Sequence, residues 1–252
     1  KSFQDSNGDG TGDLPGIISR LDVLDSLGVD IMWLTPIYAS PDVDNGYDIS
    51  DYQAIDPQYG SMADLERLLA EAHRRGMKVM MDLVINHTSD QHAWFIESRK
   101  SRDNPYRDFY IWRDGKDGRE PNNWGAHFSR SAWTLDAGTG QYYLHTFSPQ
   151  QPDLNWENPR MRQALYGMIR WWLGKGVDGF RLDAISFIAK TPGLPVNPGS
   201  ERYIFDRRHM MNGPALHEHL RELNAQALAR YDIVTVGECT RLTIQDAIDL
   251  SH

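Results

Sequence analysis

The chain has 252 residues, with 26 Lys and Arg against 35 Asp and Glu, which gives a formal net charge of −9 at pH 7. Hydrophobic residues make up 40% and charged residues 24%, as is typical of a globular domain with a large core. The negative charge argues against nucleic acid and anionic membranes as partners, because both require basic patches. It suits neutral polar ligands, and an alternative of equal weight is that the charge only keeps the protein soluble.

Four units, each a helix, a glycine and a short apolar run, follow one another along the chain. We expect helices at 14–27, 61–76, 158–176 and 213–230, each followed by a strand, at 31–38, 78–86, 177–185 and 232–239. Strands buried on both faces that alternate with helices are typical of parallel βα units. A (β/α)8 barrel and an open α/β sheet both fit this pattern, and both place active sites at the carboxyl ends of strands.

The stretch between His87 and Asn158 lacks this periodicity. It has about 70 residues, is rich in Trp, Tyr, Asn, Asp and Gly, and is too long for an ordinary loop. We therefore expect an inserted subdomain at 88–157 between two barrel parts, 1–87 and 158–252. Most of its aromatic side chains should form its own core. Phe147 is the exception, which we expect to line a sugar-binding cavity.

The segment from residue 5 to residue 13 has the composition of a metal-binding loop. Oxygen-bearing side chains alternate with glycines there, as in the first half of an EF-hand loop. The predicted ligands of a structural Ca²⁺ or Mg²⁺ are Asp5, Asn7, Asp9, Thr11 through its carbonyl group, and Asp13. The bidentate Glu of an EF-hand is missing, because Gly16 stands at its position. A polar helix-capping loop without a metal is the alternative.

Two predicted strands end in carboxylates. Arg181 and Asp183 lie on the same side of one strand, because side chains alternate with period two, and the guanidinium should hold Asp183 ionised as a nucleophile requires. Glu238 ends the next strand. Neighbouring strands lie about 4.8 Å apart, so the two carboxyls can reach the separation of about 5 to 5.5 Å found in retaining glycosidases. A structural ion pair would explain Arg181 and Asp183 equally well.

Three strings, DLVINHTSD (82–90), GFRLDAI (179–185) and TVGE (235–238), resemble signature regions of glycoside hydrolase family 13, the α-amylase family. QDSNGDGTGDLPGI, NGYDISDY (45–52), FSPQQPDLNW and MNGP (211–214) resemble its oligo-1,6-glucosidase and α-glucosidase branch. The resemblance implies a (β/α)8 TIM barrel, of which this chain holds strands two to five, with the insert after the third strand. The family's fourth region, which carries a third carboxylate, would lie beyond His252.

The resemblance also implies roles for individual residues. Asp183 would be the nucleophile, Glu238 the general acid/base and Arg181 the residue that steadies Asp183. In the subsite for the terminal glucose, Tyr47 would stack on the sugar ring, and Asp48 and His87 would form hydrogen bonds with its hydroxyl groups. Phe147 would line the same subsite. For a lone His such as His87, a structural hydrogen-bonding role is the alternative. Ala184, the residue after the nucleophile, resembles the small residue of α-1,4-preferring enzymes.

These observations together predict a retaining α-glucosidase that acts on short oligosaccharides, α-1,4 over α-1,6, through a glucosyl-Asp183 intermediate. A transglycosylase of the same branch, such as a sucrose isomerase or trehalose synthase, is one alternative. A non-catalytic relative, like the ancillary subunits of amino-acid transporters, is another. The single cysteine, Cys239, excludes an internal disulfide and is compatible with a reducing compartment. We expect a cytoplasmic monomer whose partner is its sugar substrate.

Overall fold

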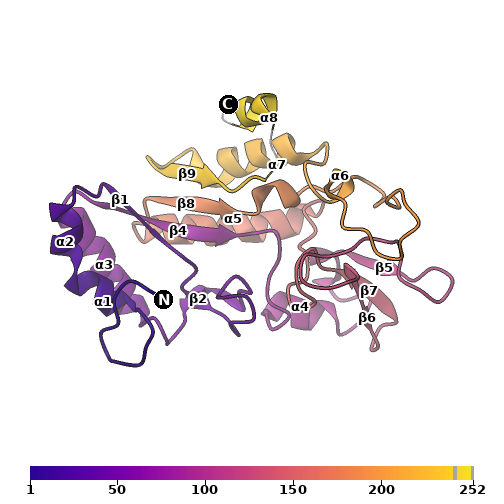
Figure 1. Ribbon diagram of the computed structural model, residues 1–252, viewed down its shortest axis with the longest axis horizontal. Helices are drawn as coiled ribbons and strands as arrows, with labels where there is room; N and C mark the ends of the chain where they lie inside the picture. Colours follow the sequence, from indigo (N-terminus) through magenta and orange to yellow (C-terminus); the bar gives the residue numbers. More distant parts are fainter. Residues whose placement is uncertain (241–242, 251–252) are drawn as a thin grey trace.

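A four-stranded parallel sheet forms the centre of the computed structural model, which describes residues 1–240 and 243–250 (Figure 1). In spatial order its strands are β1 (Ile31–Leu34), β4 (Lys78–Val84), β8 (Gly179–Asp183) and β9 (Val234–Gly237). The carboxyl ends of the strands point toward the part of the chain between β4 and α5 (Pro159–Gly174). Positions 241–242 and 251–252 of the predicted segment 158–252 lie outside the described residues.

All four predicted strands are present, and each ends earlier than predicted, for local reasons in the case of β1 and β8. β1 stops at Leu34 because Pro36 has no N–H to donate and disfavours a continuous strand. Tyr38 starts a separate strand, β2 (Tyr38–Ala39), which pairs with β3 (Asp51–Ile55) in an antiparallel ribbon. β8 stops at Asp183 because the next residue, Ala184, has a left-handed φ of +44°.

The prediction that these strands are buried on both faces is wrong for the two outer strands. The side chains of β1 alternate between exposed and buried, and those of β9 are exposed throughout. Among the described residues, each of these strands has a hydrogen-bonding neighbour on one side only, so their faces are covered less than those of β4 and β8. Gly179 keeps β8 close to β9, since a Cβ there would lie 1.9 Å from the carbonyl oxygen of Val234.

The helices begin where the sequence places their caps. Ser61 and Asp64 form the predicted capping box of α3 (Met62–Arg74), and Asn158 caps α5 ahead of Pro159. The predicted apolar stripe of α5 is buried against the sheet, and the indole N–H of Trp172 donates to the carbonyl of Tyr52 at 2.9 Å.

Two predicted helices differ from the structure. The segment 14–27 forms two short helices, α1 (Leu14–Ser19) and α2 (Leu21–Ser26), rather than one. The amide of Arg20 bonds the carbonyl of Ile17, three residues back, and this tighter turn offsets the second helix from the first. The predicted helix 213–230 begins at Leu216 as α7 (Leu216–Leu223) and continues as a π-helical segment, Asn224–Leu228.

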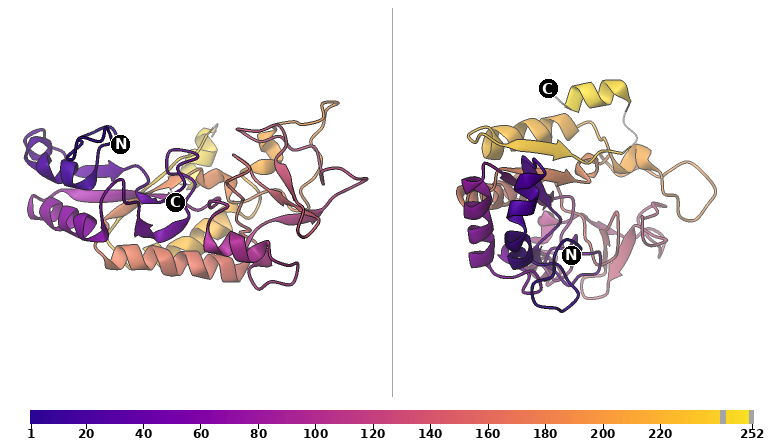
Figure 2. Two further views of the ribbon diagram at one scale, coloured as in Figure 1. Left: turned by 90° about the horizontal axis from the view of Figure 1, so that it is seen from below. Right: turned by 60° about the vertical axis from the view of Figure 1, so that its left-hand side comes forward.

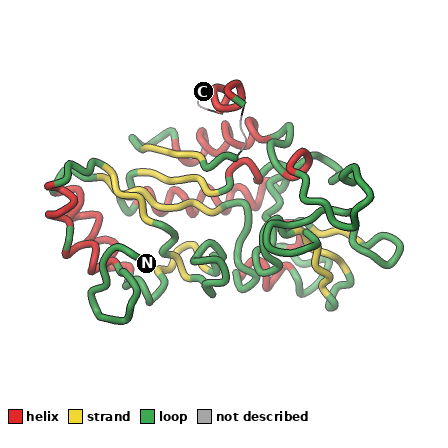
Figure 3. The backbone as a smooth tube through the Cα atoms, in the orientation of Figure 1, coloured by secondary structure: helices red, strands yellow, loops and turns green. Residues whose placement is uncertain are grey.

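The segment between β4 and α5 folds beyond the carboxyl ends of the parallel strands (Figures 1 and 3). It contains α4 (Ala93–Ser98), a 3-10 turn (Arg107–Phe109) and an antiparallel sheet in the order β5 (Trp112–Asp114), β7 (Gln141–Leu144), β6 (Trp133–Asp136). Two short helices complete the chain, α6 (Arg207–Met210) and α8 (Ile244–Leu250). Figure 2 shows α5 along one side of the parallel sheet. Within residues 1–240 and 243–250, no helix is long and apolar enough to cross a membrane.

Candidate active site

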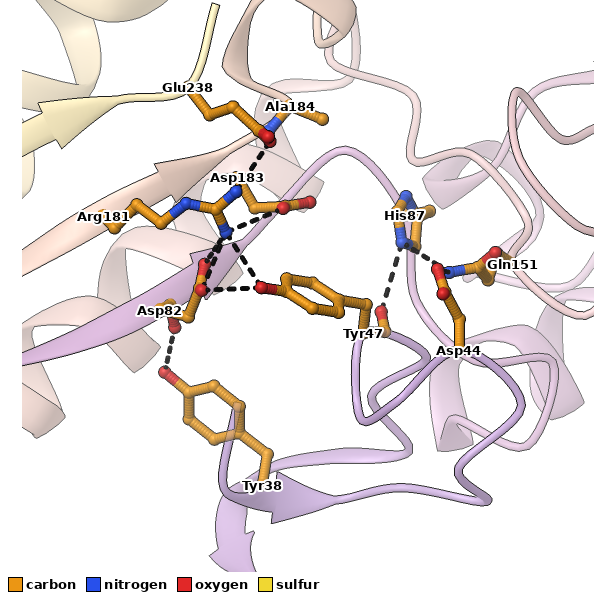
Figure 4. Close-up of polar contacts among 10 residues, drawn as sticks. All are labelled: Tyr38, Asp44, Tyr47, Asp82, His87, Gln151, Arg181, Asp183, Ala184 and Glu238. Atoms are coloured by element: carbon orange, nitrogen blue, oxygen red, sulfur yellow. Dashed lines mark hydrogen bonds and ion pairs between the residues drawn. The ribbon is translucent and has the colours of Figure 1, made fainter. Parts of the chain in front are cut away.

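Arg181 is the centre of a cluster of carboxylates at the ends of the parallel strands (Figure 4). Its Nη1 donates to both carboxylate oxygens of Asp82, at 2.8 and 2.7 Å, and to Oδ1 of Asp183 at 3.0 Å. Its Nη2 lies 2.8 Å from Oε2 of Glu238. One guanidinium therefore joins carboxylates from three adjacent strands, β4, β8 and the end of β9.

The strand register explains why these side chains meet. Asp82 of β4 pairs directly with Arg181 of β8, and Asp183 follows on the same side of the strand two residues later. Glu238 comes directly after β9, the other neighbour of β8. The sequence carries a signal for Asp82 that the prediction of site residues left out: it is the one charged residue within the apolar run 79–85.

Burial raises the pKa of Asp82 and of Asp183, the two buried carboxyls of the cluster. The pKa of Asp82 rises to about 6, with burial as the main cause and Arg181 opposing it. The pKa of Asp183 rises to about 8, because burial and the charges of Asp82 and Glu238 outweigh the guanidinium. Arg181 lowers the pKa of Asp183, which is the predicted direction, but its effect is smaller than the combined effect of burial and the neighbouring carboxylates. Asp183 therefore retains a proton near neutral pH in the cluster without a bound ligand.

A strained turn connects the nucleophile candidate with Glu238. Ala184 adopts a left-handed conformation, φ +44° and ψ 35°, which costs a residue with a Cβ on the order of 1 kcal/mol. In this conformation its amide N–H donates to Oε2 of Glu238 at 3.1 Å. The strand therefore turns sharply just after Asp183 and uses the freed amide to hold the second carboxyl.

A cavity of about 350 Å³ opens above this cluster. It is lined by Asp44, Tyr47, His87, His127, Phe128, Phe147, Arg181, Asp183, Ala184, Ser186, Phe187, Arg207, Glu238 and Thr240. The walls are aromatic and the floor is charged, which suits a ligand with both apolar faces and hydroxyl groups, such as a sugar ring. Tyr47, His87, Phe147, Arg181, Asp183 and Glu238, all singled out from the sequence, thus meet at one cavity.

Tyr47 lies between the cavity and the carboxylate cluster. Its hydroxyl donates to Oδ2 of Asp82 and accepts from Nη1 of Arg181, both at 3.2 Å. Burial, followed by the charge of Asp82, raises the pKa of Tyr47 well above its ordinary value, so that it remains a neutral phenol. Its ring is thereby fixed at the wall of the cavity.

Asp48 does not line the cavity. It is fully buried, and its carboxylate accepts hydrogen bonds from Ser40 Oγ and from the amides of Val43 and Asp44, each at 3.0 Å. The carboxylate of Asp48 therefore stabilises its own loop and does not make the predicted contact with substrate hydroxyls. The carboxylate that lines the cavity in its place is Asp44, which accepts from Nε2 of Gln151 at 2.9 Å.

The N-terminal loop uses its polar side chains on its own backbone. Asp5 accepts from the amides of Asn7, Gly8 and Gly10 at 3.0, 2.7 and 2.8 Å. Asp13 caps α1 through the amide of Gly16, as the alternative prediction has it. Within the described ranges, no group of three or more His, Cys, Asp or Glu side chains is arranged to hold a metal ion. The oxygen donors of the loop nevertheless have the chemistry that a hard cation requires.

Parallel βα units, with catalytic-type carboxylates at their carboxyl ends and an aromatic-walled cavity above them, are the arrangement of a TIM-barrel catalytic domain. The chain belongs to the α-amylase family, glycoside hydrolase family 13, since the family model of the α-amylase catalytic domain matches residues 1–249. The four-stranded sheet is accordingly part of a (β/α)8 barrel.

Close relatives and solved structures share this fold. An oligo-1,6-glucosidase of Halalkalibacterium halodurans is 61% identical over 97% of this chain and 44% of its own length. An α-glucosidase of Pediococcus pentosaceus is 56% identical over 98% of this chain and 44% of its own. A crystal structure of a mutant of MutB, a trehalulose synthase, in complex with the substrate sucrose has a TM-score of 0.94 at 51% identity, covering 98% of this chain and 44% of that one. This chain thus spans less than half the length of these relatives.

Proposed function

We propose that the protein is a retaining α-glucosidase that cleaves the terminal α-glucosidic bond of short oligosaccharides. The observation that carries the proposal is the shared guanidinium: Asp183 and Glu238 both contact Arg181 beneath one cavity. Two carboxyls at adjacent strand ends can take the short separation that retaining enzymes use. A monomeric state, a cytoplasmic location and the oligosaccharide substrate are parts of the same proposal.

In the proposed reaction the carboxylate of Asp183 attacks the anomeric carbon of the terminal glucose. The bond from that carbon to the leaving oxygen breaks, and Glu238 gives this oxygen its proton. Water then attacks the glucosyl-Asp183 ester, Glu238 takes a proton from the water, and the carboxylate of Asp183 is released. The proton that the cluster retains has to reside on Glu238 when the sugar is bound. Arg181 supports this by stabilising the carboxylate form of Asp183. Arg181 and the amide of Ala184 also donate to Oε2 of Glu238, so the proton of Glu238 is carried on Oε1.

The residues around the cavity support a glucose-sized terminal subsite. Phe147 stacks on His127 with ring centroids 4.8 Å apart and contacts His87 at 5.1 Å, which gives one apolar wall. Tyr47 gives another, and Asp44 lies near His87 in the same cavity as a hydrogen-bond acceptor for hydroxyl groups. We propose that Ala184, because it is small, favours α-1,4 over α-1,6 linkages.

A transglycosylase is the second candidate, and the match to MutB bound to sucrose favours it. The two candidates share the glucosyl-enzyme step and differ in whether water or a second sugar takes the glucosyl group. The described cavity contains the groups for the shared step, so the products have to decide between the candidates.

A structural Ca²⁺ or Mg²⁺ bound by Asp5, Asn7, Asp9, the Thr11 carbonyl and Asp13 is proposed from their oxygen donors alone. When bound, the ion would crosslink the loop ahead of α1. The loop residues are outside the set that lines the cavity, so the proposed ion has no part in the bond cleavage.

A panel of sugars tests the proposal. The 252-residue chain, and the same chain extended to the length of its relatives, would be incubated with maltose, isomaltose, sucrose and trehalose, with Asp183→Asn as control. Release of glucose from maltose that Asp183→Asn abolishes supports the glucosidase. Isomeric disaccharides formed from sucrose or maltose support the transglycosylase instead. Absence of turnover in both chain lengths would contradict both candidates and leave the non-catalytic relative.

A further inference from the structure

Lys190, which the proposed reaction does not use, is buried behind the cavity with all its hydrogen-bonding capacity taken. It is 7% exposed, and its Nζ contacts Oδ2 of Asp153 at 2.8 Å, Oδ1 of Asn86 at 3.0 Å and the carbonyl oxygen of Phe187 at 2.7 Å. An ammonium group has three protons to donate and cannot accept. Each proton therefore has one acceptor, and the acceptors are fixed as oxygens.

The three acceptors around Lys190 determine the orientation of the side-chain amide of Asn86. Only its oxygen can face the Lys190 ammonium, so its NH₂ group faces the other way. There the amide nitrogen lies 3.1 Å from Nδ1 of His87 and 3.4 Å from Oδ1 of Asp153. Two amide protons thus meet two acceptors, provided that Nδ1 of His87 carries a lone pair and no proton.

The other ring nitrogen of His87 is consistent with this assignment. Its Nε2 lies 3.2 Å from the backbone carbonyl oxygen of Tyr47, which can only accept. A proton on Nε2 therefore satisfies both contacts, with Tyr47 and with Asn86. A proton on Nδ1 would satisfy neither contact. It would only leave Nε2 of His87 free to accept from the side-chain amide nitrogen of Gln151, which lies 3.2 Å away. The side-chain amide of Gln151 is itself held in place by Asp44 and by the amide of Ser148.

A doubly protonated His87 is also disfavoured. The ring is 1% exposed, and burial lowers its pKa, with the positive charge of Lys190 acting in the same direction and the charges of Asp153 and Asp44 opposing it. A second proton on Nδ1 would point at the NH₂ group of Asn86. The imidazole is thus neutral, with a single proton on Nε2.

We propose that Lys190, acting through Asn86, is a positioning residue that locks His87 in its Nε2–H tautomer, so that the N–H of His87 is shared between the carbonyl of Tyr47 and a ligand of the cavity. The same lysine binds Asp153, which accepts from the amide of Thr146 at 2.9 Å and from its hydroxyl, next to Phe147. One buried charge thus sets both the proton on His87 and the place of the wall beside it. The step from tautomer to sugar contact rests on the proposed function, whereas the tautomer itself does not.

The tautomer can be measured directly in the 252-residue chain. Long-range ¹H–¹⁵N correlation spectra of protein labelled at its 9 histidines distinguish a protonated ring nitrogen from an unprotonated one. The His87 signals are assigned by their loss in His87→Gln. In the wild type we expect an unprotonated Nδ1 and a protonated Nε2 at pH 7. A proton on Nδ1 of the wild type overturns the proposal, whatever the variants show.

Two variants test whether the lock comes from the lysine and the asparagine. Asn86→Asp puts an acceptor opposite Nδ1, and we expect Nδ1 to gain a proton. Lys190→Met, combined with Asp153→Asn so that no buried charge is left unpaired, frees the Asn86 amide to turn, and we expect a mixture of tautomers. An unchanged His87 pattern in Asn86→Asp contradicts the proposal, provided that the signals of the other histidines show an unchanged fold.

Titration with methyl α-glucoside separates this proposal from the proposed function. We expect the sugar to shift the Nε2 signal of the wild type and to bind about tenfold more weakly to Asn86→Asp, as for the loss of one good hydrogen bond. The expected tautomer without any sugar binding, in both the 252-residue chain and the chain extended to the length of its relatives, would refute the glucosidase and uphold the lock. Equal affinity of wild type and Asn86→Asp, with the tautomer inverted, would refute the role of the lock in binding.

Discussion

Replacing Asp183 by Asn should make the chain more stable, and increasingly so as the pH rises. The folded chain raises the pKa of Asp183 to about 8 from its ordinary value near 3.8, mainly by burial. Between these two values the folded state binds more protons than the unfolded state, so this group's contribution to the free energy of unfolding is present at pH 4 and lost as the pH approaches 8. Asparagine has no proton to lose and avoids this loss.

The size of the effect follows from the pKa shift. Four pKa units at about 1.4 kcal/mol each give an upper limit of about 6 kcal/mol, and sharing of the charge with Asp82 and Glu238 reduces it to on the order of 3 kcal/mol. Urea unfolding at pH 5 and pH 8 measures it as the difference between variant and wild type. Only three of the four units lie between pH 5 and pH 8, so that difference should grow by on the order of 2 kcal/mol over this range.

Asp64→Asn is the matched control. The pKa of Asp64 is lowered, chiefly by the hydroxyl of Ser61, so Asp64 is ionised in both states above pH 5 and its replacement should cost the same at both pH values. Two results would contradict the electrostatic description of the cluster. Either the difference in unfolding free energy between Asp183→Asn and the wild type does not change with pH, as for the control, or the wild type becomes more stable relative to Asp183→Asn as the pH rises. In both cases burial does not control the charge of Asp183.

Three further predictions concern other parts of the chain. Lys190→Met should lower the free energy of unfolding by about 3–5 kcal/mol in urea titrations, because it leaves the carboxylate of Asp153 buried and unpaired, and Asp153→Asn added to it should restore part of the loss. Ala184→Val should cost about 1–2 kcal/mol by the same measurement, because a β-branched side chain is added at a left-handed φ. If the N-terminal loop binds Ca²⁺, a concentration of 100 times its Kd should stabilise the chain by about 2.7 kcal/mol in thermal unfolding, and Asp9→Asn should diminish the effect, whereas no shift with Ca²⁺ or Mg²⁺ would leave the loop as a helix cap only.

Regular structure with local causes could be predicted from the sequence. The capping box of Ser61 and Asp64 and the Asn158-Pro159 start of α5 depend on neighbouring residues alone, and both are present. The parallel strands follow from their apolar runs. The break between the helices at Arg20 could not be predicted, because it depends on the amide of Arg20 donating to the carbonyl of Ile17, three residues back. The apolar periodicity of a helix continues through this position.

The candidate site was predictable at strand ends and less so in loops. Period-two alternation places Arg181 and Asp183 on one side of β8, so their meeting follows from the sequence. In the loop 40–48 no such period exists, and the sequence does not tell whether Asp44 or Asp48 faces the cavity. The structure decides for Asp44, since Asp48 is held by its own loop. The raised pKa of Asp183 depends on burial and on three charges that come from separate strands.

The most direct test of the central claim is to trap the glucosyl-enzyme intermediate and locate it. The active protein would be inactivated with 5-fluoro-α-glucosyl fluoride, a substrate whose covalent intermediate hydrolyses slowly, and its peptides analysed by mass spectrometry. We predict a single fluoroglucosyl group on Asp183, with no label in Asp183→Asn. A label on Asp82, Glu238 or any other carboxyl, or rapid turnover without any covalent species, would contradict Asp183 as the nucleophile of a retaining enzyme.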